Sequence, residues 1–235
     1  MNARSILTFL FIFCVMLLAQ DQKQPYNPAE PAMIFDLYWE AATPQNYTIT
    51  VQTSGKATYV SRNPTRPESS SQQSDPDYTL DFTISPATRD RMFLLAKAAN
   101  YFQGKFDYTK HRVASTGKKT LTYADPTRHF DTTYDYSENP TIEEVTRIFQ
   151  GISNTIEHGR KLQFLRRFDK LGLEAELKAM EEQAAGHYLN ELQVIAPTLE
   201  SIANDPSVLN IARQRAKRLL AQSAKEEASY VKPER

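Results

Sequence analysis

The stretch that decides the fold is YTLDFTISPATRDRMFLLAKAA, residues 78–99. Its first seven residues alternate between large apolar and polar side chains, which is the period of a β-strand with one buried face. Ser85 then offers a helix N-cap, and Pro86 suits the first turn. The apolar residues that follow recur at helical spacing. The sequence therefore predicts a half-buried strand that passes directly into an amphipathic helix.

Two predicted β-hairpins flank this segment. The first covers residues 47–61 and turns at Ser54-Gly55, and the second covers residues 119–136. Between the first hairpin and the strand, residues 62–77 are rich in Ser, Pro and Gln and predict a loop. Over residues 33–138 strands outnumber helices. We therefore expect an α+β domain there, with an antiparallel sheet and a helix packed on one face.

From Asn139 onward the apolar pattern becomes helical, and its apolar positions, expected on the buried face, include Leu162 and Phe168. Asn139 is an N-cap candidate, and Pro140 after it fits a first turn. Glycine weakens a helix interior, so Gly159 predicts either a bend in one long helix or a break between two. Gly172 is expected to cap the end of this helix. Further helical segments follow, so we expect an all-helical C-terminal portion over residues 139–226 and a tail over residues 227–235.

The first residues predict export. Arg4 precedes an uncharged apolar run from Ile6 to Ala19, and polar Gln20 follows. This is the three-part pattern of a cleavable signal peptide, here residues 1–19. A membrane anchor is the alternative, but an anchor needs about 20 apolar residues, and this run has fourteen. Residues 20–32 contain three prolines and predict an extended leader.

The composition bounds the location and the partners. Cys14 is the only cysteine and lies inside the predicted signal. A mature chain of about 215 residues can bury an adequate core without disulfides. This favours a periplasmic or extracellular protein of a bacterium, with no stable membrane insertion of the mature chain. The sequence has 28 basic and 28 acidic residues, and this balance excludes long-range attraction to nucleic acid.

The densest polar cluster lies on the last predicted strand. His129, Asp131 and Asp135 share one parity of that strand, so they could hold a metal ion or serve as acid and base. A row of this kind is also what the wet face of a one-sided sheet contains. We favour the wet face, and we predict no metal and no cofactor. The sequence has no zinc-protease, nucleophile-elbow or phosphate-loop motif.

The last predicted helix concentrates positive charge. Arg213 and Lys217 lie four residues apart on one face, opposite its apolar residues. Such a stripe could meet anionic lipid headgroups or an acidic partner. A solvated helix face explains it as well, so both interpretations stay open.

Residues 195–222 resemble one unit of the HEAT-type helical repeats. Pro197 stands inside the first helix of the unit and Asp205 in the turn. Arrays of such units usually scaffold protein partners, and they need about three stacked units for stability. The resemblance therefore implies an interaction surface; a helical hairpin that closes the fold is the alternative.

Residues 35–152 resemble an uncharacterised domain of bacterial envelope proteins. The shared outline is a Tyr-x-Ile-x-Val strand from Tyr47, a glycine turn, a strand-to-helix step and a Gly-Lys-Lys hairpin at Gly117. Members of that family carry a Cys-Pro pair ahead of the first strand, where this chain has Thr43-Pro44. The resemblance implies a fold and an envelope location, and it carries no activity.

These features predict an exported, non-catalytic binding or interaction protein of the bacterial cell envelope. Its partner would be an envelope protein or polymer that the sequence does not identify. The alternative is an envelope hydrolase whose site is assembled from residues distant in sequence.

Export makes a direct prediction about the N-terminus. Protein recovered from the periplasm or the medium should begin within a few residues of Gln20, because signal peptidases cut after a small residue such as Ala19. Intact-mass spectrometry measures this. A full-length mass in the membrane fraction would show that the apolar run acts as an anchor instead.

Overall fold

A computed structural model describes residues 29–62 and 77–231, with the side chains of residues 226–231 excepted. The predicted signal peptide, most of the leader and nearly all of the predicted loop over residues 62–77 lie outside the described residues. The end of the leader is in place, because the Glu30 carboxylate accepts a hydrogen bond of 2.7 Å from the hydroxyl of Thr53.

The expected α+β architecture is confirmed. Six strands form one antiparallel sheet in the order β4-β3-β2-β1-β5-β6. The strand that opens the domain therefore lies in the middle, between the two predicted hairpins. The strands are β1 Ala32–Tyr38, β2 Asn46–Gln52, β3 Lys56–Arg62, β4 Tyr78–Thr83, β5 Lys118–Ala124 and β6 His129–Tyr134.

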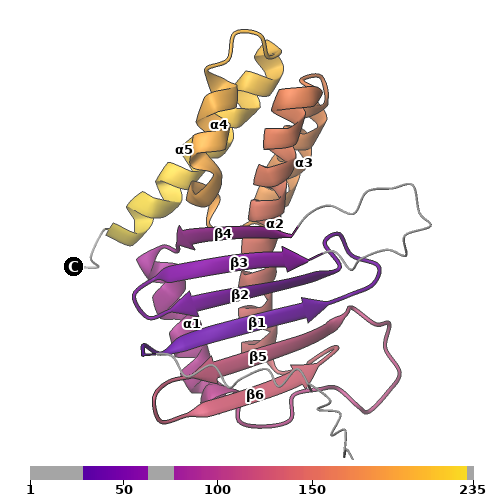
Figure 1. The fold of residues 1–235 in the computed structure, drawn as a ribbon, viewed down its shortest axis with the longest axis vertical. Coiled ribbons are helices and arrows are strands. Elements are labelled where there is room, and N and C mark those ends of the chain that lie inside the picture. Colours follow the sequence, from indigo (N-terminus) through magenta and orange to yellow (C-terminus); the bar gives the residue numbers. More distant parts are fainter. Residues whose placement is uncertain (1–28, 63–76, 232–235) are drawn as a thin grey trace, which may run out of the picture.

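The helices occupy one face of the sheet and one end of the molecule. Figure 1 shows α1 and α2 behind the sheet, with the C-terminal half of α2 extending past the β4 edge, where α3, α4 and α5 gather around it. The helices are α1 Pro86–Ala98, η1 Asn100–Phe102, α2 Pro140–Phe168, α3 Gly172–Ala185, η2 Leu192–Ile195, α4 Ala196–Ala203 and α5 Asn210–Val231. The last helix thus continues past residue 226, the expected end of the helical portion.

Two predicted caps start the helices that cover the sheet. The Ser85 hydroxyl accepts a hydrogen bond from the Thr88 amide at 3.3 Å at the start of α1. The Asn139 side chain accepts from the amides of Thr141 and Ile142 at the start of α2. Each cap satisfies amides that have no partner inside the helix.

There are two hydrophobic clusters, and α2 belongs to both. Beneath the sheet, Phe149 of α2 stacks on Phe35 of β1 with ring centroids 5.0 Å apart. Beyond the sheet edge, Leu162 of α2 packs with residues of α3, α4 and α5, including Leu177 and Leu199. Polar side chains such as Thr48, Thr120 and Asp131 line the opposite face of the sheet, and none of the described helices covers that face (Figure 1).

The structure corrects the expectation for Gly172 and decides between the alternatives for Gly159. Gly172 does not cap the end of α2; it is the first residue of α3, and Asp169 caps α2 instead. Gly159 does not break the helix into two, since α2 runs without interruption from Pro140 to Phe168. A Cβ atom on Gly159 would lie 2.4 Å from Cγ2 of Ile195. The glycine is therefore required by the close approach of η2.

Gly159→Ala should destabilise the protein although alanine is the better helix former. The propensity gain is about 1 kcal/mol, whereas overpacking a core costs about 1–3 kcal/mol. We expect a net loss in the free energy of unfolding, measured by urea denaturation. Ile195→Ala removes the obstructing methyl group, so Gly159→Ala should cost less in that background. A Gly159→Ala variant more stable than the parent would contradict this packing.

Candidate functional site

The end of α2 exposes large apolar side chains. Phe164, Phe168 and Leu171 are 59%, 69% and 74% exposed. The rings of Phe164 and Phe168 lie 5.0 Å apart between centroids, as their spacing of one helical turn allows. We call these three residues the apolar stripe. Exposed apolar patches with a polar rim mark interaction sites.

The apolar stripe corrects the expected core. The sequence pattern placed Phe168 on the buried face of the helix, together with Leu162. Leu162 is indeed buried, but Phe168 is exposed. The reason is that α2 has already left the sheet at this point, and α3, α4 and α5 cover only its other side. One feature of the sequence indicates an exposed apolar surface here. Phe164 departs from the apolar period of the helix, and two charged residues, Arg166 and Arg167, follow it within three positions.

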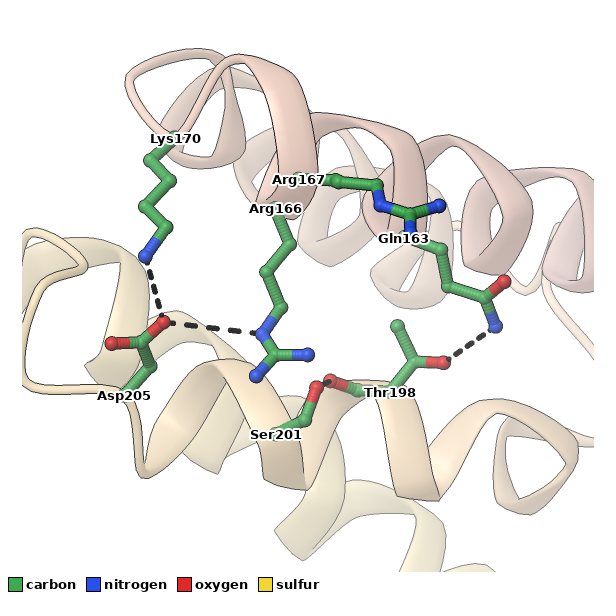
Figure 2. A pocket seen from close by; sticks show the side chains of 7 residues that line it. All are labelled: Gln163, Arg166, Arg167, Lys170, Thr198, Ser201 and Asp205. Carbon is green, nitrogen blue, oxygen red and sulfur yellow. Dashed lines mark hydrogen bonds and ion pairs between the residues drawn. The ribbon is translucent and has the colours of Figure 1, made fainter.

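A basic cleft lies next to the apolar stripe. It has a volume of about 330 Å³ and separates the end of α2 from α4 and the turn after it (Figure 2). We call it the basic cleft; its lining residues are Gln163, Arg166, Arg167, Lys170, Thr198, Ser201 and Asp205.

One carboxylate organises the cations of the basic cleft. Oδ2 of Asp205 lies 3.0 Å from Nζ of Lys170 and 3.9 Å from Nε of Arg166 (Figure 2). The hydroxyl of Ser207 and the ammonium of Lys170 both donate to Asp205 and hold its pKa well below the usual range. Asp205 is therefore charged at neutral pH. Its single negative charge is outnumbered by the three cations that line the cleft, Arg166, Arg167 and Lys170, so the cleft has an excess of positive charge.

Arg167 is placed between the basic cleft and the apolar stripe. It lines the cleft, and its guanidinium carbon lies 5.7 Å from the ring centroid of Phe168. Gln163 and Thr198 close the far side of the cleft through a hydrogen bond of 3.1 Å (Figure 2). The arrangement combines fixed positive charge with apolar surface and can receive an anionic group.

The two predicted basic residues of α5 lie on the same helix in different settings. Lys217 is exposed, and Arg213 is half-buried, with Nη2 3.4 Å from Oδ1 of Asn210. Among the described residues no hydrogen-bond partner is present for Nε of Arg213. Arg213 lies in the first turn of α5, which begins at Asn210 after the turn that carries Asp205. It therefore belongs to the same end of the molecule as the basic cleft.

Two other basic residues of α5, Arg215 and Arg218, are engaged with α3. Arg215 lies 3.0 Å from Glu174 and also pairs with Glu181, and Arg218 lies 2.7 Å from Glu181. These pairs join the two helices. The face with Arg213 and Lys217 does not take part in them.

The structure separates Asp135 from the other two residues of the predicted row, His129 and Asp131. His129 and Asp131 are exposed on β6, an edge strand, and they line a depression of about 720 Å³ on the open face of the sheet. Asp135 lies beyond the end of β6, where it accepts a 2.7 Å hydrogen bond from the amide of Thr116. Burial would raise the pKa of Asp135, but hydrogen bonds from Ser115 and Thr116 outweigh it and lower the pKa.

The described residues contain no group of three or more His, Cys, Asp or Glu side chains placed to hold a metal ion. A further cleft of about 590 Å³ beside Trp39 and Tyr188 contains two carboxylates, Glu143 and Glu157. They are fourteen residues apart on α2, which is about 21 Å along the helix. Paired carboxylates in glycoside hydrolases lie about 5–10 Å apart, so these two cannot act together on one bond.

Alanine substitutions can separate the two parts of the row. His129→Ala and Asp131→Ala should each change the free energy of unfolding by less than about 0.5 kcal/mol, as surface substitutions do. Asp135→Ala should cost about 1–2 kcal/mol, because it removes a charged hydrogen-bond acceptor from Thr116. Thermal unfolding measures both, and added zinc, calcium or manganese should leave the parent's melting temperature unchanged. A metal-dependent rise that disappears in the His129→Ala/Asp131→Ala double variant would show a metal site.

Comparison with known proteins does not assign this chain to a family. No family model matches it, and no curated protein matches it. In the part of the chain that the structure describes, no helix combines the length and the apolar character needed to cross a bilayer. The candidate site therefore rests on geometry and charge.

Proposed function

We propose that the protein is an exported, non-catalytic interaction module of the bacterial cell envelope, and that it binds its partner through the end of its helical layer. One observation carries the proposal: the apolar stripe is exposed immediately beside the basic cleft. A surface of this composition is suited to docking, since burying it gives affinity and its charges give orientation.

The hydrophobic contribution is large enough to matter. Each side chain of the apolar stripe is more than half exposed, and full burial of a Phe or Leu side chain is worth about 1.5–3 kcal/mol. Contact with a partner would recover part of this free energy at each of three positions. Aromatic anchors with a polar surround are the usual centre of a binding surface.

The charge indicates an anionic partner. Residues 163–171 and 204–214 carry four basic residues, Arg166, Arg167, Lys170 and Arg213, and two acidic ones. The whole sequence is balanced, so the excess is a local property of this end. Lys217 extends it by one helical turn. Complementary potentials favour encounter with an acidic envelope protein or polymer over a neutral one.

Further support comes from the sequence. The signal-peptide pattern of residues 1–19 supports export, to the periplasm or the extracellular space. The resemblance of residues 35–152 to an envelope domain agrees with that location. The hydrolase alternative depends on the row around His129, and the hydrogen bond from the Thr116 amide already engages one of its three groups, Asp135.

The proposal predicts that binding to envelope material depends on the apolar stripe. In Phe164→Ser/Phe168→Ser, retention by a sedimented envelope fraction should weaken about tenfold or more, because truncating aromatic anchors costs at least about 1 kcal/mol each. Both side chains are exposed, so unfolding should shift by less than about 0.5 kcal/mol per site.

Leu94→Ser is the matched control. Leu94 is 57% exposed on α1, away from the end of the helical layer, and its replacement should leave retention unchanged. Equal retention of the parent, the double variant and the control would overturn the proposed binding surface.

A further inference from the structure

We infer that the surface that receives the end of the helical layer is an anionic lipid bilayer, with the apolar stripe entering the headgroup region and the basic side chains contacting the headgroups. This inference rests on the proposed function and names the partner. It concerns peripheral binding, in which the protein lies on the membrane.

The position of the apolar stripe suits a broad surface. The α2–α3 turn and the α4–α5 turn lie together at the outermost end of the molecule (Figure 1). Lys170 binds Asp205 and Ser207 and so ties the end of α2 to the α4–α5 turn. Directly after that turn, Leu209 and Ile211 are 48% and 51% exposed. Two separate elements thus present apolar side chains at one end, which a bilayer can contact simultaneously.

The dimensions fit interfacial binding. Phe164 and Phe168 lie one turn apart on α2, about 6 Å along the helix, and Leu171 follows in the turn before α3. Apolar faces of interfacial helices enter a membrane by about 5–10 Å. The stripe can therefore enter the headgroup region without any unfolding of α2.

The charges lie where headgroups would be. The guanidinium of Arg167 is 5.7 Å from the centre of the Phe168 ring. Arg167 can therefore bind a lipid phosphate while the neighbouring Phe168 ring enters the membrane toward the acyl chains. Arg and Lys side chains commonly place their apolar stems along lipid and their charges at the interface. Each basic residue near an anionic membrane strengthens binding about fivefold, and Arg166, Arg167 and Lys170 lie together here.

The same charges disfavour a second copy of the chain. Pairing two apolar stripes around a two-fold axis would bring Arg166, Arg167 and Lys170 of both copies together. Like charges in such an interface repel. An acidic protein would not have this defect, and it becomes one outcome of the test.

A fluorescent reporter can test the inference at the site itself. Trp39 is the only tryptophan, and it lines the cleft that also contains Glu143 and Asn154, away from the end of α2. In a Trp39→Phe background, Phe168→Trp places a single reporter in the apolar stripe. Its emission should shift to the blue with vesicles of phosphatidylcholine containing 30% phosphatidylglycerol, and not with phosphatidylcholine alone. Leu94→Trp in the same background is the control and should not shift.

Charge reversal supplies a second measurement. Arg166→Glu/Arg167→Glu should weaken cosedimentation with the anionic vesicles at least tenfold, as should 0.5 M salt. The matched control is Lys105→Glu/Lys118→Glu, which reverses two exposed lysines of the sheet domain and should retain binding within about twofold, by the same screening argument.

The outcomes separate the inference from the proposed function. No shift at position 168, or equal shifts at positions 168 and 94, overturns the lipid inference. If vesicles are not bound but Phe164→Ser/Phe168→Ser still loses envelope retention, the partner is an anionic protein or polymer and the proposed function stands. If Phe164→Ser/Phe168→Ser changes neither envelope retention nor vesicle binding, both the lipid inference and the proposed function are wrong.

Discussion

The rest of the structure depends on α2 crossing two hydrophobic cores as one unbroken helix. Its first half is fixed under the sheet by contacts such as Phe149 on Phe35, and its second half contributes Leu162 to the helical core. A helix of 29 residues is about 43 Å long, whereas six strands spaced about 4.8 Å apart span only about 24 Å. The excess length carries the apolar stripe and the basic cleft away from the sheet. Without this continuity, the sheet domain and the helical end would be two weakly connected bodies.

Buried polar contacts reinforce that connection. The carboxylate of Glu191, in the helical portion, accepts hydrogen bonds of 2.6 and 2.8 Å from the amide and hydroxyl of Ser85. The carboxylate of Glu176 on α3 is hydrogen-bonded to Nδ1 of His158 on α2 at 2.6 Å. Burial alone would raise the pKa of Glu176, but the hydrogen bonds from His158 and Lys161 lower it. These contacts hold the helical end in one orientation, and a surface held in this way needs little reorganisation on binding.

The two faces that solvent reaches differ in kind. The open face of the sheet is lined by threonines and by His129 and Asp131, and such polarity is the ordinary consequence of leaving one side of an antiparallel sheet in water. The helical end combines exposed phenylalanines with cations, which hydration alone does not explain. This contrast moves the functional interpretation from the strand, where the chemistry of the residues first suggested it, to the end of α2.

Local features of this fold were determined by the sequence itself. The alternation of residues 78–84, the caps at Ser85 and Asn139 and the polar face of β6 depend on neighbours within a few positions, so periodicity and capping chemistry predict them. The order of the strands, the role of Gly159 and the exposure of Phe168 were decided by tertiary structure. Whether an apolar residue is core or surface depends on what packs opposite it. Asp205 likewise reaches Lys170, 35 residues away, only because two helical hairpins meet.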